Sequence, residues 1–333
     1  MTTVTQSTTG AQPPAPTPAV SPSGSTAVRL VRAEILKLWT TNTWWIFGIC
    51  ALAATGLALL VNGFQADYEI GQAHNPPNFN EGFPPGQGPP PEDIARQQQN
   101  WAEQFNLGRI LLTSAANLYT SGQFFGLMFV MLIGTLIVTN EFHHQTATAT
   151  FLTTPKRTEV ILAKLGGAVG IAGVFWLVST IISISVGVAF FAGQGETNSL
   201  GEWPVTRAIL FNLLAYAIWA VLGVGIGVLI RSQLGATLTG GALYFLGLFL
   251  AQGVFYLIYA FLIKEEWVLK AMVLVPGVAS SVMIAPTPPI FGNTNEGAPI
   301  YGPQWWVGAL VLVGYGVLAG AIGTLITRKR DIS

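Results

Sequence analysis

The stretch LGGAVGIAGVFWLVSTIISISVGVAFFA, residues Leu165 to Ala192, contains no charged side chain. A helix needs about 17 to 25 mostly apolar residues to cross the roughly 30 Å hydrocarbon core of a membrane, and this stretch is long enough to do so. Five further stretches of the same character are Trp44 to Val61, Gly122 to Thr139, Ala208 to Ile230, Gly235 to Ile263 and Trp305 to Thr327. The sequence therefore predicts an all-α integral membrane protein with six transmembrane helices.

The basic residues between these stretches are divided unequally between the two sides on which the loops alternate. Five of the 15 Lys and Arg residues fall on one side, and the rest fall on the side that holds the N-terminus. Because cytoplasmic loops carry an excess of Lys and Arg, the N-terminal side is predicted to be cytoplasmic. An even number of spans returns the chain to that side, so both termini are predicted to be cytoplasmic.

The overall composition excludes several classes of protein. Hydrophobic residues make up 51% of the chain and charged residues only 9%, which is too apolar for an ordinary soluble domain. The formal net charge of zero predicts no nucleic-acid partner. The single cysteine, Cys50, lies in the first span, where it has no partner for an intramolecular disulfide and is predicted to serve in packing.

Two segments precede the first span. Residues 1–26 are rich in Thr, Ser, Pro, Ala and Gln and lack charge, which predicts a disordered cytoplasmic tail before a membrane domain over residues 27–333. Residues 28–40 carry apolar side chains at helical spacing, with Arg29, Glu34 and Lys37 predicted to point elsewhere. This pattern predicts an interfacial helix that contacts membrane lipids.

The second cytoplasmic segment, residues 140–164, reads NEFHHQTATATFLTTPKRTEVILAK. A carboxylate, Glu141, stands where the second span leaves the membrane. Thr154 as N-cap and Pro155 at the first helical position would start the third helix well below the membrane, because proline lacks the N–H that is unsatisfied there. A short surface helix is predicted between the two spans.

This segment resembles the permease subunits of type-2 ATP-binding cassette (ABC) transporters, particularly bacterial exporters. In that family the second span ends in Glu and an aromatic residue, followed by polar residues and often Gly-Thr, then Leu, Pro or Ser with Arg, and Lys-Leu. The corresponding residues here are Glu141-Phe142-His143-His144-Gln145-Thr146, Phe151-Leu152, Pro155-Lys156-Arg157 and Lys164-Leu165. Gln145 stands where many members have Gly.

The resemblance implies a coupling helix within residues 140–164 that sits in a groove of a separate ATPase subunit. The short loop at Arg231 would make a second, smaller contact. The residues that the resemblance assigns to ATPase coupling are Glu141, His143, Thr146, Thr148, Phe151, Leu152, Pro155, Arg157 and Arg231. A solvated loop whose Lys-Arg pair only sets the topology is the alternative. The resemblance further implies a bacterial plasma (inner) membrane and a second permease chain, identical or different.

The chain carries no catalytic pattern of its own. It lacks the G-x-x-x-x-G-K-[ST] loop that binds nucleotide phosphates, so ATP hydrolysis is expected in a partner subunit. The adjacent His143 and His144 would point about 100° apart on a helix and have no further histidine nearby in the sequence, which argues against a metal site. No enzyme activity, cofactor or metal is therefore predicted.

The spans contain no Asp, Glu, Lys or Arg near their centres. Ion-coupled transporters need such groups or unwound ion sites, so the sequence argues against a self-powered transporter. Asn212, Tyr216 and Gln252 are candidates for lining a path for an uncharged cargo. Hydrogen bonding between helices is the alternative role for each of them.

Two outer segments are long. Residues 62–121 contain a Pro- and Gly-rich front half, predicted to be an extended loop, and a back half from Glu92 to Tyr119, predicted to form an outer helix. Residues 264–304 include the apolar run Ala271 to Ile284, which is too short to cross a membrane. This run is predicted to be re-entrant or interfacial before the last span.

These observations lead to two hypotheses from different classes. The first is a permease subunit of an ATP-driven exporter that moves a hydrophobic or amphipathic cargo, such as a lipid, drug or natural product. The second is a non-transporting scaffold or assembly subunit of an envelope or respiratory complex, which would share the uncharged spans but leaves residues 140–164 without a role. A membrane-embedded enzyme ranks third, because no acid–base pair shares a face within a span.

Overall fold

The computed structural model describes residues 26–79, 88–146, 157–294 and 298–329. Helices make up most of these residues, and six of them are long and apolar enough to cross a membrane. The chain is therefore a multi-pass membrane protein of the predicted all-α class.

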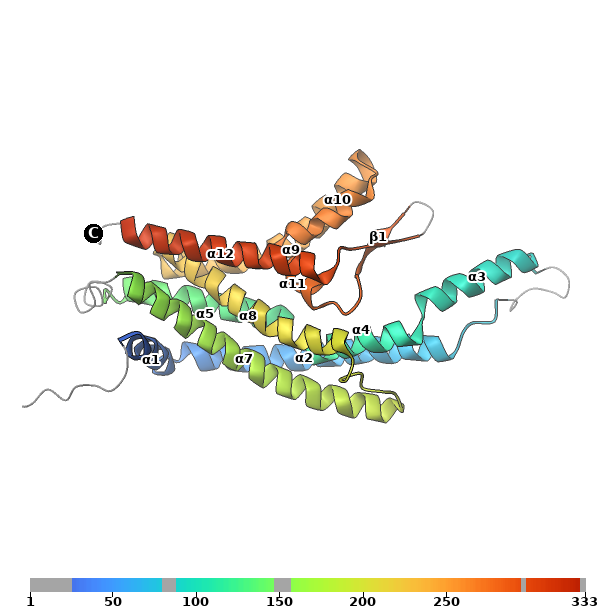
Figure 1. Cartoon of the computed structure of the whole chain (residues 1–333), viewed down its shortest axis with the longest axis horizontal. Coiled ribbons are helices and arrows are strands. Elements are labelled where there is room, and N and C mark those ends of the chain that lie inside the picture. The colour runs from blue at the N-terminus through green and yellow to red at the C-terminus, as the bar shows by residue number, and fades with distance from the viewer. Residues whose placement is uncertain (1–25, 80–87, 147–156, 295–297, 330–333) are drawn as a thin grey trace, which may run out of the picture.

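The helices and strands are shown in Figure 1. They are α1 (Thr26–Trp39), α2 (Thr43–His74), α3 (Pro91–Gln104), α4 (Leu107–Tyr119), α5 (Gln123–His143), α7 (Arg157–Gln194), α8 (Trp203–Leu229), α9 (Gln233–Leu257), the π-helix η1 (Ile258–Leu262), α10 (Glu266–Lys270), the 3-10 helix η2 (Ala271–Leu274), α11 (Pro276–Ile284), β1 (Ile290–Asn293), β2 (Pro299–Tyr301) and α12 (Trp305–Lys329).

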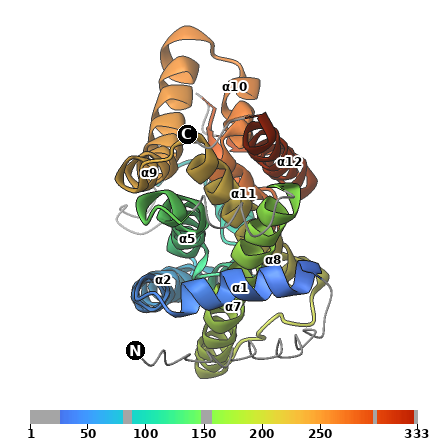
Figure 2. The same cartoon turned by 90° about the vertical axis from the view of Figure 1, so that its left-hand side faces the viewer.

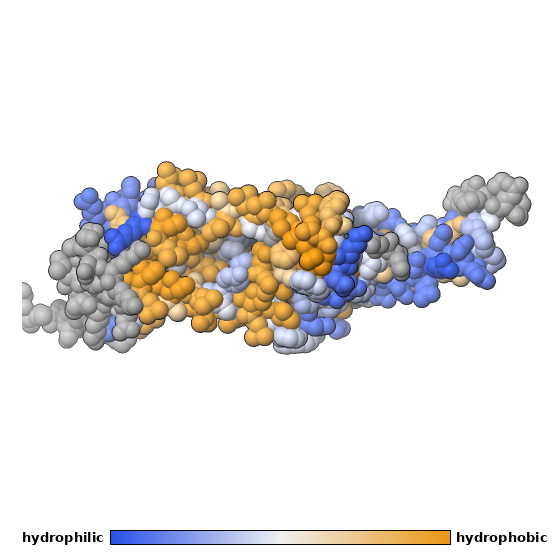
Figure 3. All heavy atoms as spheres, turned by 90° about the horizontal axis from the view of Figure 1, so that it is seen from above, coloured by the Kyte–Doolittle hydropathy of each residue, from blue (hydrophilic) through white to orange (hydrophobic). Residues whose placement is uncertain are grey.

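The spans lie side by side with α5 and α8 at the centre. In the end view of Figure 2, α1, α2 and α7 lie on one side of this central pair, and α9 and α12 lie on the other. The apolar stretch of α5 is the most deeply buried of the six and that of α9 the least. Hydrophobic side chains cover the middle of the molecule, whereas the end that carries α3 is hydrophilic (Figure 3).

Close backbone approach holds the central pair together. A Cβ atom on Gly223 of α8 would lie 1.9 Å from the carbonyl oxygen of Met131 on α5, so only glycine fits there. The Thr135 hydroxyl of α5 donates to the Gly223 carbonyl at 3.0 Å. In lipid no hydrophobic force drives helices together, so their association depends on close packing. Small residues such as glycine permit this close packing.

The first span is longer than predicted. The apolar stretch ends at Val61, but α2 continues to His74, where Asn75, Pro76 and Pro77 follow. Polar residues are more frequent from Asn62 to His74, and the helix continues through them beside the segment that precedes α5. The Asn62 amide, for example, donates to the Ser121 hydroxyl at 2.9 Å. Cys50 is exposed on α2, so its predicted packing role within the chain is wrong.

The predicted outer helix from Glu92 to Tyr119 is two helices, α3 and α4. The Asn106 side chain accepts the Arg109 N–H at 3.0 Å and caps α4, which separates it from α3. α4 packs against α2, α7 and α8, and Tyr119 at its end is fully buried. Asn is a residue type that commonly starts a helix, so Asn106 was a local signal for this break that the single-helix prediction did not use.

A second break separates α4 from α5. The residues at the break, Thr120 and Ser121, are buried, and the Tyr216 hydroxyl donates to the Gly122 carbonyl at 2.8 Å. The Tyr244 hydroxyl also donates to the Phe124 carbonyl. The tyrosine bonds are additional ones, since the Gly122 carbonyl also accepts the Gly126 N–H at the start of α5. The Asn117 carbonyl near the end of α4 accepts from the Asn62 amide and the Ser121 hydroxyl, as an irregular backbone in a membrane protein requires.

The segment before the last span is too short to cross a membrane, as the sequence predicts, and it is also bent, which the sequence does not predict. Residues 266–274 and α11 meet at 97°, and neither part is long enough to cross a membrane alone. α11 packs against α8 and α12, where a Cβ on Gly308 would lie 2.5 Å from the Ala279 carbonyl oxygen. The antiparallel pair β1–β2, which was not predicted, follows α11.

The first prediction concerns the central pair. Gly223→Ala should lower the free energy of unfolding by about 1–3 kcal/mol, because the added methyl group must push α8 away from the α5 backbone. Gly173→Ala on α7 is the matched control, since a Cβ there meets nothing within 4 Å. Thermal unfolding of both purified variants in detergent measures the difference. Equal unfolding temperatures would contradict the assigned packing.

Candidate functional site

The α1 helix lies across one end of the bundle, against α7 (Figure 2). A Cβ on Gly167 of α7 would come within 3.3 Å of the Cβ of Glu34, so a larger residue would hold α1 away. Glu34 faces this contact and is only 6% exposed. The prediction that Glu34 points elsewhere than the apolar residues of its helix is therefore wrong, because Val31 and Ile35 face α7 as well.

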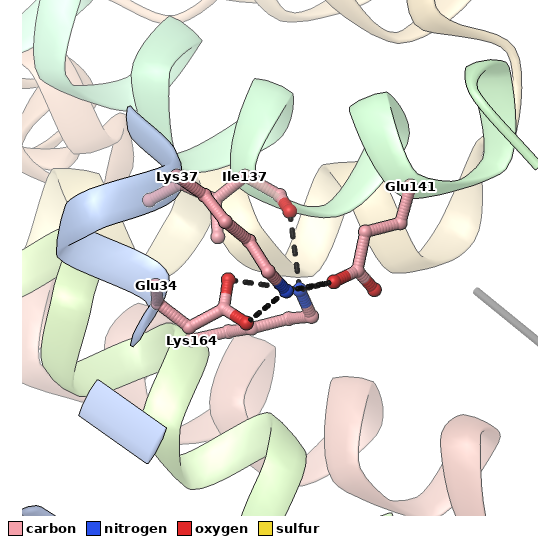
Figure 4. A network of polar contacts seen from close by, with 5 residues as sticks. All are labelled: Glu34, Lys37, Ile137, Glu141 and Lys164. Carbon is pink, nitrogen blue, oxygen red and sulfur yellow. Dashed lines mark hydrogen bonds and ion pairs between the residues drawn. The ribbon is translucent and has the colours of Figure 1, made fainter. Parts of the chain in front are cut away.

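Four charged side chains from three helices meet at this contact (Figure 4). The Lys37 ammonium lies 2.8 Å from the Glu34 carboxylate on α1 and 2.8 Å from the Glu141 carboxylate near the end of α5. The Lys164 ammonium of α7 lies 3.1 Å from Glu34 and 2.9 Å from Glu141. Each lysine thus contacts both carboxylates, and we call these four residues the ion-pair cluster.

The cluster is buried and its formal charges cancel. The Lys164 side chain is 3% exposed, whereas Lys37 is 50% exposed and closes the cluster towards the surface. Lys164 also donates to the Ile137 carbonyl of α5 at 3.3 Å, so its three N–H groups all have acceptors. A buried ammonium is tolerated only when it is paired and hydrogen-bonded in this way.

The surroundings of Lys37 keep its ammonium group charged at physiological pH. Burial by itself would lower the pKa of the Lys37 ammonium, but hydrogen bonds to Glu141 and Glu34 outweigh it and raise the pKa. A raised pKa in the folded state gives stability that is present below the ordinary lysine value of about 10.4 and is lost as the pH rises through the folded value. Lys37 therefore does not switch the cluster near neutral pH.

Sequence reasoning placed Glu34 and Lys37 on the interfacial helix and Glu141 at the end of the second span, but it missed their association with Lys164. Glu141 and Lys164 flank the predicted coupling segment, and Glu34 and Lys37 share one helix face. These spacings were visible signals, but the pairing of three distant segments was not. The absence of charges near the span centres does not exclude buried charges near the span ends.

The turn after α5 places Gln145 in a backbone conformation that is unusual for a residue other than glycine. Gln145 has φ +55°, in the left-handed region that favours glycine. The Thr146 N–H donates to the Glu141 carbonyl at 2.9 Å, and the Gln145 N–H donates to the Phe142 carbonyl at 3.3 Å. These two bonds form a Schellman motif, which ends the helix beside the ion-pair cluster. The geometry therefore fits the Gly that stands at this position in the resembling family.

The start of the first predicted contact segment, at Phe142 and His143, lies beside the second, at Arg231. The Arg231 guanidinium, between α8 and α9, lies 5.4 Å from the centre of the Phe142 ring. Phe142, His143 and Arg231 line an open hollow of about 730 Å³ together with the first turn of α9. His143 and Arg231 are exposed, so their side chains are accessible to a partner at this end of the bundle.

Of the other predicted coupling residues, the structure describes two and leaves four outside the described residues. Thr146 is exposed in the turn after α5. Thr148, Phe151, Leu152 and Pro155 lie outside the described residues, as does the predicted start of the third helix at Thr154. Arg157 begins α7.

The three candidate path residues do not gather within the chain. Asn212 and Tyr216 are buried on α8, and Tyr216 serves the break before α5. The Asn212 side-chain oxygen lacks a hydrogen-bond partner among the described residues. Gln252 is exposed on α9. A common path wall made by these three residues of one chain is therefore not supported.

Arg207 is a further buried charge that the sequence did not reveal. Its guanidinium lies 4.6 Å from the centre of the Trp305 ring and donates to the Ala285 carbonyl at 2.6 Å. Arg207 thus connects the start of α8 to the chain after α11 and to α12. In the sequence it counts only as an outer loop cation.

Comparison with known proteins adds no identification. No family model matches the chain, and no curated protein matches it either. The site must therefore be interpreted from its own geometry and from the resemblance of residues 140–164.

The ion-pair cluster yields a prediction about stability. Lys164→Met should lower the free energy of unfolding by about 3–5 kcal/mol, because it leaves two buried carboxylates with one ammonium. Lys37→Met should cost less, since water reaches this half-exposed side chain. Denaturation of the purified variants in detergent measures both effects.

Two further variants make this test specific. Lys270→Met removes a lysine from an exposed pair with Glu266 and should change stability by less than about 1 kcal/mol. Adding Glu34→Met to Lys164→Met removes one charge of each sign and should recover part of the loss. If Lys164→Met behaves like Lys270→Met, the cluster does not hold the helices together.

Proposed function

We propose that this chain is the permease subunit of an ATP-driven exporter of the type-2 ABC class. The observation that carries the proposal is the ion-pair cluster, which ties α1 to both helices that flank the predicted coupling segment. The adjacent hollow at Phe142, His143 and Arg231 supports it, because the two segments expected to contact an ATPase lie at the same end of the bundle.

The cluster suggests how a push could be transmitted. A partner that moves the segment between α5 and α7 must also move Glu141 and Lys164, and through them Glu34 and Lys37 on α1. Charges buried in this way resist separation, since each would lose its partner. The three helices would therefore respond as one unit when a bound ATPase closes and reopens.

The orientation follows from the distribution of charge. α1, the end of α5, the α8–α9 turn and the end of α12 lie at one end of the bundle (Figure 1). We assign this end, with both termini, to the cytoplasm of a bacterial plasma membrane, because it carries the excess of Lys and Arg. The hydrophilic end with α3 would then face outward.

A second permease chain is expected at α9. This helix is the least buried span, and Gln252 exposes an amide in its apolar sequence. A lone amide facing lipid is costly, and it gains a hydrogen bond if another helix covers it. The transport path for a hydrophobic or amphipathic cargo would form between two such chains.

The first test of the function is the identity of the associated proteins. The tagged chain should be purified gently from its native membrane, and every co-purifying protein identified by mass spectrometry. A stoichiometric subunit with a G-x-x-x-x-G-K-[ST] loop is the expected result. Recovery with an envelope or respiratory complex and no ATPase would support the scaffold hypothesis instead.

The assigned orientation predicts which residues an impermeant reagent reaches. In a Cys50→Ser background, Gln97→Cys on α3 should react with a membrane-impermeant maleimide in intact cells. His144→Cys after α5 should react only once the membrane is permeabilised. Both positions are exposed, so access and not burial decides the result. The reverse pattern of labelling would overturn the assignment of the termini to the cytoplasm.

The next prediction concerns the hollow lined by Phe142, His143 and Arg231, which is the proposed contact with the ATPase subunit. His143→Ala and Arg231→Ala together should reduce the stimulation of the partner's ATPase activity by roughly ten-fold, because two exposed contacts worth about 1.4 kcal/mol are lost. ATPase assays on the reconstituted complex measure this effect. Arg96→Ala, an exposed change on α3, is the control. Wild-type stimulation in the double variant, at unchanged thermal stability, would contradict the coupling role of the hollow.

A further inference from the structure

Arg207 is a buried cation far from the ion-pair cluster. It lies in the second turn of α8, and the starts of α8 and α12 lie towards the end of the bundle that carries α3 (Figure 1). The residue is only 6% exposed. A buried charge is costly unless it has both hydrogen-bond partners and a compensating charge, so both must come from its surroundings.

The three nitrogens of the Arg207 guanidinium differ in their surroundings. Nη2 donates to the Ala285 carbonyl at 2.6 Å and to the Pro286 carbonyl at 3.5 Å. Nε is shielded from the surface and has no acceptor among the described residues. Nη1 also makes no hydrogen bond with a described residue, but it is not one of the shielded atoms that lack a partner. Nη1 is therefore the nitrogen that is open to the outside.

The positive charge of Arg207 is not cancelled by a carboxylate of the described residues. The guanidinium lies 4.6 Å from the centre of the Trp305 ring, whose face compensates the charge in part. Glu202, the acid nearest to it in the sequence, is exposed at the N-cap of α8 and forms no ion pair with it. In the ion-pair cluster, by contrast, each lysine contacts two carboxylates. Arg207 thus lacks the counter-charge that the buried lysine of this chain has.

The neighbours of Arg207 place it at the depth of lipid headgroups. Trp203 on α8 and Trp306 on α12 are exposed tryptophans at the starts of two spans. Exposed tryptophans of membrane helices gather at the boundary between lipid and water. Two turns after Trp203, Leu210 is exposed on α8, as expected where the helix meets the lipid tails. Arg207 lies between these two positions, so its open Nη1 faces the headgroup layer.

Phosphate is the anionic group that this layer supplies. Every phospholipid headgroup contains one, and guanidinium N–H groups form short, charge-assisted hydrogen bonds with phosphate oxygens. A phosphate at Nη1 would provide both the missing acceptor and the missing negative charge. The shielded Nε would take no part, so the contact is made through one nitrogen.

We propose that Arg207 binds the phosphate of a phospholipid in the leaflet on the α3 side, through Nη1. The Ala285 carbonyl and the Trp305 ring hold the guanidinium in position, and the lipid phosphate cancels its charge. The start of α8, the start of α12 and the chain after α11 therefore form one lipid site. The site goes beyond the proposed transport function, because a scaffold protein with this structure would bind the lipid equally well.

Native mass spectrometry of the full chain in detergent measures the binding of added lipid. The wild-type chain should bind phosphatidylglycerol about ten-fold more tightly than Arg207→Gln does, the ratio expected for one charge-assisted hydrogen bond. Diacylglycerol with the same acyl chains lacks the phosphate, so it should bind equally to both proteins. Equal binding of phosphatidylglycerol to the two proteins would overturn the proposal.

Two further variants make the result specific to the charge at position 207. Arg109→Gln removes another arginine, whose Nη1 already donates to the Tyr301 hydroxyl, and should leave the lipid affinity unchanged. Arg207→Lys keeps the positive charge and should bind phosphatidylglycerol more tightly than Arg207→Gln. Equally weak binding by the Lys and Gln variants would contradict the role of the charge. The wild-type preference for phosphatidylglycerol over diacylglycerol requires no variant to fold, and its absence would also overturn the proposal.

Inorganic phosphate distinguishes a lipid site from a site for a free anion. An excess of inorganic phosphate should not displace phosphatidylglycerol from the wild-type chain, because the acyl chains add apolar contacts that the free ion lacks. Displacement would assign the site to a soluble anion and overturn the lipid assignment. None of these measurements involves an ATPase or a cargo, so failure of the proposed transport function would leave them unaffected.

Discussion

The Lys164 ammonium is the constraint on which one end of this bundle depends. It is almost completely buried, so each of its N–H groups needs an acceptor and its charge needs compensation. Glu34, Glu141 and the Ile137 carbonyl meet these needs, and Lys37 balances the second carboxylate. Because the acceptors come from α1 and α5, neither helix can move away from α7 without leaving a charge unpaired. An arrangement of this kind specifies position more than it adds stability.

A related constraint acts where the helices break. In lipid no water is present to bond an open carbonyl group, so irregular backbone persists only where protein groups satisfy it. At the α4–α5 break the Asn117 carbonyl accepts from the Asn62 amide and the Ser121 hydroxyl. The Tyr216 hydroxyl adds a bond to the Gly122 carbonyl, which also accepts the Gly126 N–H. The close contact of Gly223 with α5 keeps α8, and hence Tyr216, at the necessary distance. The break can therefore lie in the buried part of the molecule.

The two ends of the bundle differ in chemistry, and each offers a different surface. The α1 end combines a neutralised charge cluster with exposed His143 and Arg231, a setting suited to a protein partner. The opposite end, which carries α3, is hydrophilic (Figure 3). α2 runs from the end that carries α1 towards this end, so one continuous helix connects the two.

Hydropathy alone was enough to predict the helical class, the six apolar spans and an apolar run before α12 that is too short to cross a membrane. These features depend on local composition, because the bilayer requires each span to satisfy its own backbone. The left-handed turn at Gln145 was not predicted.

Other features depended on contacts between distant segments and could be known only from the tertiary structure. Glu34 was expected to lie off the apolar face of its helix, but it faces Lys164 of α7. Gln252, a candidate path residue like Asn212, is exposed on another helix. The packing of α4 against α2, α7 and α8 likewise joins segments that are far apart in the sequence. A sequence pattern specifies which groups must be satisfied, whereas only the folded chain determines which groups satisfy them.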